Sequence, residues 1–188
     1  MTRIVGIAGS LRRASFNAGL LRAAARCLPD GASLDIASIR DVPLYDGDEE
    51  AANGIPGAVA VLKEAVAQAD ALLIATPEYN NSIPGVLKNA IDWITRPPQD
   101  IAKVVRGKPV AVIGATPGGM GTVLAQAALL PVMRTLGMRW YSGGLLYVSG
   151  ARNLFDESGE LTGGELGERL QKYLAGFVDF VNGRQTAR

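Results

Sequence analysis

The sequence predicts a doubly wound α/β fold, in which helices cover both faces of a parallel sheet. The first observation is a set of short apolar runs without alternation, such as Ala71 to Ala75, which are typical of strands buried on both faces. The second is that these runs tend to be followed by a polar or glycine-rich loop and then by apolar residues at helical spacing. Five strands alternating with five helices are expected on this basis.

The first half of the chain should contain two strands and two helices. The strands are expected at 3–9 and 33–39, and the helices begin near Phe16 and Pro56, the second extending to about Ala69. Residues 41–53 are rich in Asp, Glu, Gly and Pro, so a surface loop is expected there.

The second half should contain three strands, at 71–75, at 109–114 and within 139–148. Helices are expected after Pro84, at about 122–136 and at 166–181. Pro131 removes one hydrogen bond of the second of these helices and should kink or break it. The adjacent glycines Gly143 and Gly144 interrupt the last strand, where we expect a bulge.

Composition limits the possible functions. The 188 residues fit one domain spanning 1–188, and the net charge of +1 comes from scattered charges, which argues against nucleic-acid or membrane-surface binding. Small-molecule partners are therefore expected. The absence of histidine excludes His-based triads and His metal ligands, and the single Cys27, predicted to be inert core, excludes disulfides and Cys-x-x-Cys redox pairs. The apolar run from Ile4 to Ala8 is too short for a signal peptide or membrane span, so a cytoplasmic location is expected.

The loop after the first strand combines hydroxyls, a guanidinium and an amide next to the start of a helix. The relevant side chains are Ser10, Arg12, Ser15 and Asn17. Free N–H groups and the positive end of the helix dipole favour an anion, and arginine adds a charge-assisted donor pair, so a phosphate suits this loop. The alternative is that Ser15 or Asn17 caps the helix while Arg12 is solvated.

The stretch from Pro77 to Gly85 follows the most apolar strand and should face a ligand, because open α/β sheets bind ligands at the carboxyl ends of their strands. Tyr79 can pack on a planar ring, although a single tyrosine is more often a packing residue. Glu78 is a candidate for a general acid or base, and Asp92 could pair with it electrostatically. Asp92 is expected to cap, to pair with Arg96 or to face solvent.

The loop after the fourth strand, from Gly114 to Gly121, lets backbone approach a flat ligand because four positions lack a side chain. Met120 stands where a nucleotide-hydrolase phosphate loop needs lysine, so that assignment is rejected. No Gly-x-Gly-x-x-Gly follows the first strand either. The alternative is a plain glycine-rich turn.

Together these loops resemble those of the NADPH-dependent FMN reductase family, the flavodoxin-like branch that includes chromate and quinone reductases. Three motifs carry the resemblance: Gly9-Ser10-Leu11-Arg12 with Ser15 and Asn17; Pro77-Glu78-Tyr79-Asn80 with Ser82, Pro84-Gly85, Leu87 to Trp93 and Arg96; and Pro117-Gly118-Gly119. The likeness extends over nearly the whole chain, with Thr95 where serine is common and Pro131 as the second departure.

The resemblance implies a flavodoxin-like five-stranded parallel sheet of order 2-1-3-4-5 with helices on both faces. It implies that Ser10, Arg12, Ser15 and Asn17 hold the FMN phosphate. It further implies that the flavin ring is lined by Pro77, Glu78, Tyr79, Asn80 and Ser82, and on the other side by Thr116, Gly118 and Gly119. No metal site and no catalytic side chain are implied, because hydride passes directly from nicotinamide to flavin and then to the acceptor.

The implied activity is that of an NAD(P)H oxidoreductase acting on quinones, free flavin, azo compounds or chromate, as a homodimer or homotetramer whose second subunit completes the acceptor pocket. NADPH and NADH both remain open as the donor, and so does the physiological acceptor. The alternative is a flavodoxin-type electron carrier or flavin-dependent regulatory protein, which the net charge of +1 and the arginine in the phosphate loop disfavour.

Overall fold

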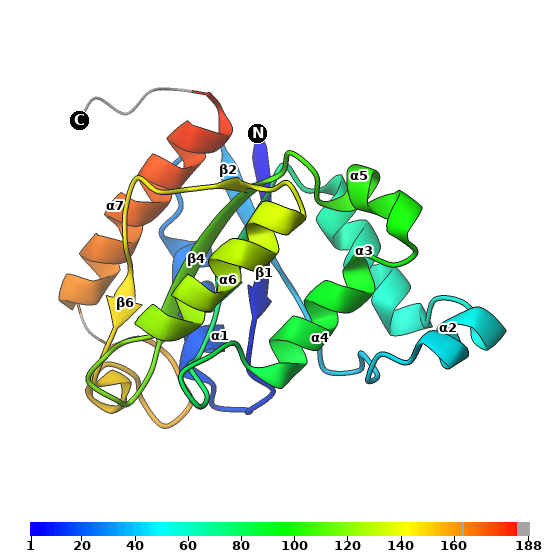
Figure 1. Cartoon of the computed structure of the whole chain (residues 1–188). Helices are drawn as coiled ribbons and strands as arrows, with labels where there is room; N and C mark the ends of the chain where they lie inside the picture. The colour runs from blue at the N-terminus through cyan, green and yellow to red at the C-terminus, as the bar shows by residue number, and fades with distance from the viewer. Residues whose placement is uncertain (163, 184–188) are drawn as a thin grey trace.

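A parallel sheet forms the centre of the computed structural model, which describes residues 1–162 and 164–183 (Figure 1). The strands lie in the order β2-β1-β3-β4-β5, and a further short strand, β6, pairs with β4. Their bounds are β1 Thr2–Ala8, β2 Ala32–Ala37, β3 Ala71–Ala75, β4 Pro109–Ala115, β5 Arg139–Trp140 and β6 Tyr147–Val148. The flavodoxin-like order 2-1-3-4-5 is therefore confirmed.

Helices connect the strands in the alternation that the sequence predicts. Their bounds are α1 Phe16–Arg26, α2 Gly47–Asn53, α3 Gly57–Gln68, α4 Gly85–Ile94, α5 Ile101–Val104, α6 Val123–Thr135 and α7 Gly164–Val181, with single 3-10 turns η1 at Pro98–Asp100 and η2 at Ala151–Asn153. All described strand pairs are parallel, so each connection crosses back over the sheet.

Both faces of the central strands β3 and β4 are buried, which explains why their apolar runs do not alternate. β3 is buried along its whole length. Leu73 packs in a core formed with α1 and α7, whereas its neighbours Leu72 and Ile74 pack in a second core formed with α3, α4 and α6. In Figure 1, α4 and α6 accordingly lie in front of the sheet and α1 behind it.

The fifth strand position is occupied by two short strands instead of one. β5 pairs with the start of β4 and β6 with its end. The segment between them leaves the sheet at Tyr141, and a Cβ added at Gly143 would lie only 2.6 Å from the ring of that tyrosine. The bulge expected at Gly143 and Gly144 is therefore wrong: the strand divides there, with glycine where the aromatic ring passes closest.

The surface loop predicted at 41–53 is wrong in part, because its second half forms α2. This helix buries none of its residues, so no apolar period marks it in the sequence. It begins instead with a local cap, in which Asp46 accepts a hydrogen bond from the backbone N–H of Asp48 (2.8 Å). The single-turn α5 is a further helix that the sequence does not predict.

α6 continues through Pro131, so the break expected at that residue is wrong. Pro131 is exposed, and the backbone N–H of Leu136 bonds to the carbonyl of Val132 (3.1 Å), so helical hydrogen bonding resumes directly after it. Among residues 1–162 and 164–183, no helix is both long and apolar enough to cross a membrane.

Candidate functional site

The loops that follow β1, β3 and β4 meet at one edge of the sheet, the lower edge in Figure 1. The backbone N–H of Gly9 donates to the carbonyl of Ala75 (2.8 Å), which joins the first loop to the second. The N–H of Thr76 donates to the carbonyl of Ile113 (2.9 Å), which joins the second to the third. The three motifs singled out in the sequence thus share one site, at the carboxyl ends of neighbouring strands.

The first loop ends in a helix cap. Ser15 is buried and its hydroxyl accepts a hydrogen bond from the N–H of Ala18 (3.3 Å), so the capping interpretation holds for this residue. Ser10 folds the start of the loop, because its hydroxyl accepts from the N–H of Arg12 (3.3 Å). The Arg12 side chain is exposed, with its guanidinium 5.9 Å from the ring centroid of Phe16.

Asn17 joins the first loop to the third. Its side chain is buried, its amide NH₂ donates to the carbonyl of Ala115 (2.9 Å), and its oxygen accepts from the N–H of the same residue (2.9 Å). Both polar ends of the amide are therefore engaged at the end of β4. A role in anchoring the two loops is thus evident, and only one amide hydrogen is left over for a ligand.

The second loop contains a tight turn that the sequence analysis did not identify. Tyr79 and Ser82 exchange backbone hydrogen bonds (3.2 and 3.0 Å), and the two residues between them, Asn80 and Asn81, both have positive φ. Asparagine tolerates this conformation better than other side-chain-bearing residues, so the pair Asn-Asn was the available signal. The turn presents Tyr79, which is 46% exposed, beside the edge of the sheet.

Glu78 is engaged with α6. Its carboxylate accepts hydrogen bonds from the backbone N–H groups of Leu124 (2.8 Å) and Ala125 (3.0 Å), at the N-terminus of the helix. The residue at the cap position itself, Thr122, makes no side-chain cap bond. Glu78 thus satisfies free helical N–H groups and places a negative charge at the positive end of the dipole, which argues against the weak general acid or base hypothesis.

The third loop faces open space at Gly118 and Gly119. Thr116 is held by two backbone bonds, from its own N–H to the carbonyl of Val148 (2.9 Å) and from the N–H of Ala151 to its carbonyl (3.1 Å). A Cβ added at Gly119 would meet no atom within 4 Å, and one at Gly118 would reach only the Thr116 hydroxyl at 4.0 Å. Backbone is therefore exposed to open space here, as close approach of a flat ligand requires.

The charge at this edge suits an anion. Among the described residues, the ion pairs involve Arg22, Arg26, Lys63, Lys88 and Arg96, and none involves Arg12 or Arg13 in the first loop. Two guanidinium groups without a carboxylate thus lie beside the start of α1, which suits a phosphate. No group of potential metal ligands is found within the described part of the chain.

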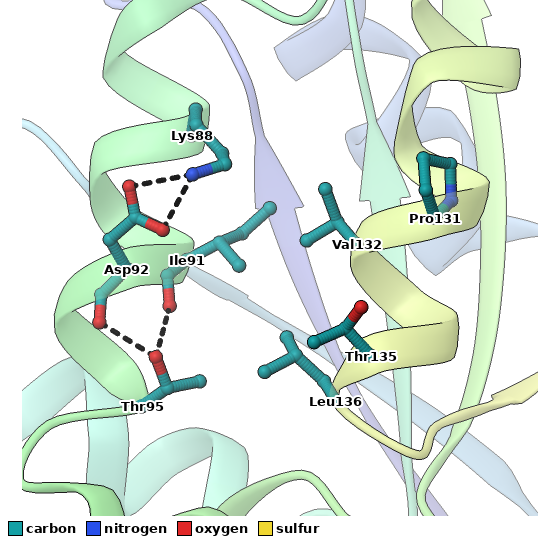
Figure 2. Close-up of a pocket in the computed structure, with 8 residues that line it drawn as sticks. All are labelled: Lys88, Ile91, Asp92, Thr95, Pro131, Val132, Thr135 and Leu136. Atoms are coloured by element: carbon teal, nitrogen blue, oxygen red, sulfur yellow. Dashed lines mark hydrogen bonds and ion pairs between the residues drawn. The ribbon is translucent and has the colours of Figure 1, made fainter.

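The carboxylate of Asp92 and the guanidinium of Arg96 do not pair with each other. Asp92 pairs with Lys88 one turn earlier (2.7 and 2.9 Å), beside a pocket between α4 and α6 shown in Figure 2. No predicted site residue lines this pocket. Arg96 instead donates to Glu50 of α2 (2.7 Å), which lowers the pKa of that carboxyl and raises the pKa of the guanidinium.

The segment before α2 is fixed to α4, which the sequence did not indicate. The indole N–H of Trp93 and the amide of Asn89 both donate to the carbonyl of Pro43 (2.8 Å each), and Asn89 also accepts from the N–H of Tyr45 (2.9 Å). The ring of Tyr45 meets that of Trp93 edge-on at 4.9 Å. α4, which follows the second site loop directly, is thereby held on its outer side as well.

Cys27 is half-buried beside the core of α1 and α7, and burial raises the pKa of its thiol. A thiol that stays protonated is a poor nucleophile, which agrees with the predicted inert role.

Comparison with known proteins gives concordant matches. The model of the NADPH-dependent FMN reductase family matches residues 2–153. The chain is 42% identical over 172 residues to an NAD(P)H-dependent FMN reductase of Pseudomonas aeruginosa, covering 92% of this chain and 91% of the relative. It is 39% identical over 177 residues to a 2-hydroxy-1,4-benzoquinone reductase of a Burkholderia species, covering 94% and 92%.

Solved structures agree with the fold. FerB, a flavoenzyme NAD(P)H:acceptor oxidoreductase from Paracoccus denitrificans, matches with a TM-score of 0.86 at 34% identity, covering 98% of this chain and 99% of that chain. The apo form of an NADH:FMN oxidoreductase matches with a TM-score of 0.65 at 22% identity, covering 100% and 92%. At that identity the second likeness concerns the fold alone.

Proposed function

Because the chain belongs to the NADPH-dependent FMN reductase family, we propose that it passes hydride from NADPH or NADH through FMN to a small-molecule acceptor, with quinones as the principal class. The observation that carries the proposal is the meeting of the loops after β1, β3 and β4 at one edge of the sheet. Free flavin, azo compounds and chromate are further candidate acceptors.

In this proposal the FMN phosphate binds at the loop between β1 and α1. Arg12 supplies a charge-assisted donor pair, and Ser10 and the first N–H groups of α1 supply neutral donors. Ser15 shapes the helix start through its cap, and Asn17 holds the loop against Ala115. The exposed guanidinium, which pairs with no carboxylate of residues 1–162 and 164–183, supports this assignment.

The flavin ring then lies between the second and third loops. On one side are Pro77, Glu78, Tyr79, Asn80 and Ser82; on the other are Thr116, Gly118 and Gly119. The open space in front of Gly118 and Gly119 supports the placement of the third loop on the second side of the ring. The hydrogen-bonded turn supports the placement of Tyr79 on the first side, because the backbone that carries its aromatic ring is already held beside the sheet edge.

FMN, when bound, supplies the hydride chemistry, so the protein needs neither a nucleophile nor a histidine. The side chains orient the cofactor and exclude water from it. Glu78 is already committed to the N–H groups of Leu124 and Ala125, so it fixes α6 beside the ring and does not move a proton. Arg12 balances the charge of the phosphate.

A flavodoxin-type electron carrier is the less favoured function, since the relatives quoted above are named as reductases at 39% and 42% identity over most of the chain. We also propose that residues 1–188 act as one domain in a homodimer or homotetramer. The exposed leucines Leu124 and Leu130 of α6 support an oligomer, and light scattering after gel filtration tests it. A cytoplasmic location remains a prediction, to be tested by cell fractionation.

Anaerobic stopped-flow spectroscopy tests the activity. FMN-reconstituted protein is mixed with NADPH and, separately, with NADH, and bleaching of the flavin is followed in the visible. Fast bleaching is expected with at least one donor, and the ratio of rates gives the nucleotide preference. Flavin that binds and stays oxidised with both donors would overturn the reductase proposal in favour of the carrier.

A further inference from the structure

Arg40 reaches into the phosphate loop from a neighbouring strand. It follows β2, and its guanidinium donates a hydrogen bond to the backbone carbonyl of Leu11 (2.7 Å), 29 residues away in the chain. Leu11 lies between β1 and α1, in the loop assigned above to the FMN phosphate. No sequence motif marks Arg40, and no family motif quoted above includes it.

The carbonyl that Arg40 holds belongs to the same peptide group as the N–H of Arg12. That N–H donates to the hydroxyl of Ser10 (3.3 Å), on the opposite side of the peptide. Because a peptide group is planar, bonds to its oxygen and to its nitrogen together fix the orientation of the whole unit. Arg40 and Ser10 therefore clamp the Leu11–Arg12 peptide from both sides, and this peptide sets the direction in which the Arg12 side chain leaves the backbone.

The backbone that carries Arg40 is itself well held. Ile39 is only 5% exposed and packs in the core that contains Val5 and Ile7 of β1. The hydroxyl of Ser38 accepts from the N–H of Arg40 (3.1 Å), which closes a local turn. The guanidinium is thus presented to the loop from an anchored position, although its side chain is exposed.

Charge adds to the argument. In the part of the chain that the structure describes, Arg40 has no ion-pair partner, as is also true of Arg12. An arginine that stabilised the fold as an ordinary surface ion pair would face a carboxylate. This one donates to a carbonyl of the phosphate loop.

We propose that Arg40 is a positioning residue for the phosphate subsite: by holding the Leu11–Arg12 peptide, it orients Arg12 toward the phosphate. The proposal rests on the proposed function, in which that loop binds the FMN phosphate. Arg40 acts through Arg12, so its contribution depends on Arg12 being present and on the ligand carrying a phosphate.

The experiment is a double-mutant cycle with two ligands. Dissociation constants for FMN and for riboflavin, which lacks the phosphate, are measured by flavin fluorescence for the parent protein, Arg12→Ala, Arg40→Ala and the double variant. Arg169→Ala, an exposed arginine on α7, removes the same charge elsewhere and is the matched control. Arg40→Lys keeps the charge and one donor, and Arg40→Met keeps the aliphatic stem if the alanine variant folds poorly.

Arg40→Ala should weaken FMN binding roughly three- to tenfold and leave riboflavin binding unchanged. In the Arg12→Ala background, the same substitution should change the affinity for FMN by less than about twofold. Arg40→Lys should recover part of the loss. Three outcomes would overturn the role of Arg40 alone. The effects of the two substitutions on FMN affinity could add independently in the double variant, or Arg40→Ala could weaken riboflavin binding as much as FMN binding. Arg40→Ala could also leave FMN affinity unchanged while Arg12→Ala lowers it. If Arg12→Ala has no effect and FMN binds no better than riboflavin, the assignment of the phosphate loop fails as well.

Discussion

The carboxylate of Glu78 accepts a hydrogen bond from the backbone N–H of Leu124 at 2.8 Å, across 46 positions of the chain. A second N–H, that of Ala125, donates to the same oxygen (3.0 Å). The side chain that follows β3 thus caps the helix that follows β4. The second and third loops of the site are therefore coupled by a charge at a helix N-terminus.

Replacing Glu78 by alanine should lower the free energy of unfolding by about 1–2 kcal/mol, because two helical N–H groups lose their acceptor. Glu78→Gln keeps an acceptor oxygen and should recover most of the loss. Urea unfolding followed by circular dichroism measures both, with Glu168→Ala on the exposed side of α7 as control. An alanine variant as stable as the parent would show that the cap contributes nothing.

Arg12→Ala should weaken FMN binding by about 1.5–3 kcal/mol, the range for a hydrogen bond to a charged group. Flavin retained after gel filtration in dilute solution gives a first measure, and fluorescence titration gives the constant. Purified Arg12→Ala protein with full flavin occupancy under those conditions would contradict the phosphate assignment.

Asn17→Ala should cost about 3 kcal/mol of unfolding free energy, because it leaves both the N–H and the carbonyl of Ala115 without their partner in a buried place. Thermal or urea unfolding tests this in the flavin-free protein, so that loss of cofactor does not confuse the result. Asn153→Ala, at an exposed turn, is the control and should change stability little. A loss for Asn17→Ala no larger than that of the control would contradict the anchoring role.

The pair between Arg96 and Glu50 predicts a pH dependence of stability. The hydrogen bond from Arg96 lowers the pKa of the Glu50 carboxyl below its value in the unfolded chain, 4.5. The stabilisation is therefore present in full above that pH and is lost as the pH falls through the lower pKa of the folded state. Glu50→Gln should accordingly lower the urea midpoint at pH 7 and make little difference only below the lowered pKa of the folded state.

For this comparison Glu157→Gln is the matched control, since Glu157 is exposed. If Glu50→Gln lowers the urea midpoint equally at neutral and acidic pH, the charge of Glu50 does not contribute to stability. The loss would then come from disturbed packing of the neutral amide near Tyr45.

The sequence predicted the elements that carry an apolar pattern and missed two short helices that do not show one. β3 was located at its observed bounds, because a run of five apolar residues that ends at a turn signal favours a strand buried on both sides. α2 has no buried residue and α5 has a single turn, so neither leaves a periodic signal. The last strand divides where the ring of Tyr141 passes close to Gly143, a contact that the sequence pattern does not show.

At the candidate site, the sequence selected residues that the structure brings to one edge of the sheet, but it could not identify their partners. Ser10, Ser15 and Asn17 were all selected, yet the bond between Asn17 and Ala115 joins residues 98 apart and has no local signature. The bond between Glu78 and Leu124 has no local signature either, and Arg40, which bonds to Leu11, was not selected from the sequence at all. Whether a polar side chain serves the ligand or the backbone is decided by tertiary distance, which pattern analysis does not supply.

The two hydrogen bonds between Asn17 and Ala115 bear on the stage of folding at which the site can form. The two residues are separated by β2, β3 and the helices between them, so joining them carries the entropic cost of a long loop and must await the assembly of β1, β3 and β4. A nascent chain that ends before Ala115 has the loop between β1 and α1 but not the contact that fixes it to the sheet. The first loop of the site therefore gains its attachment to the sheet only when β4 is in place.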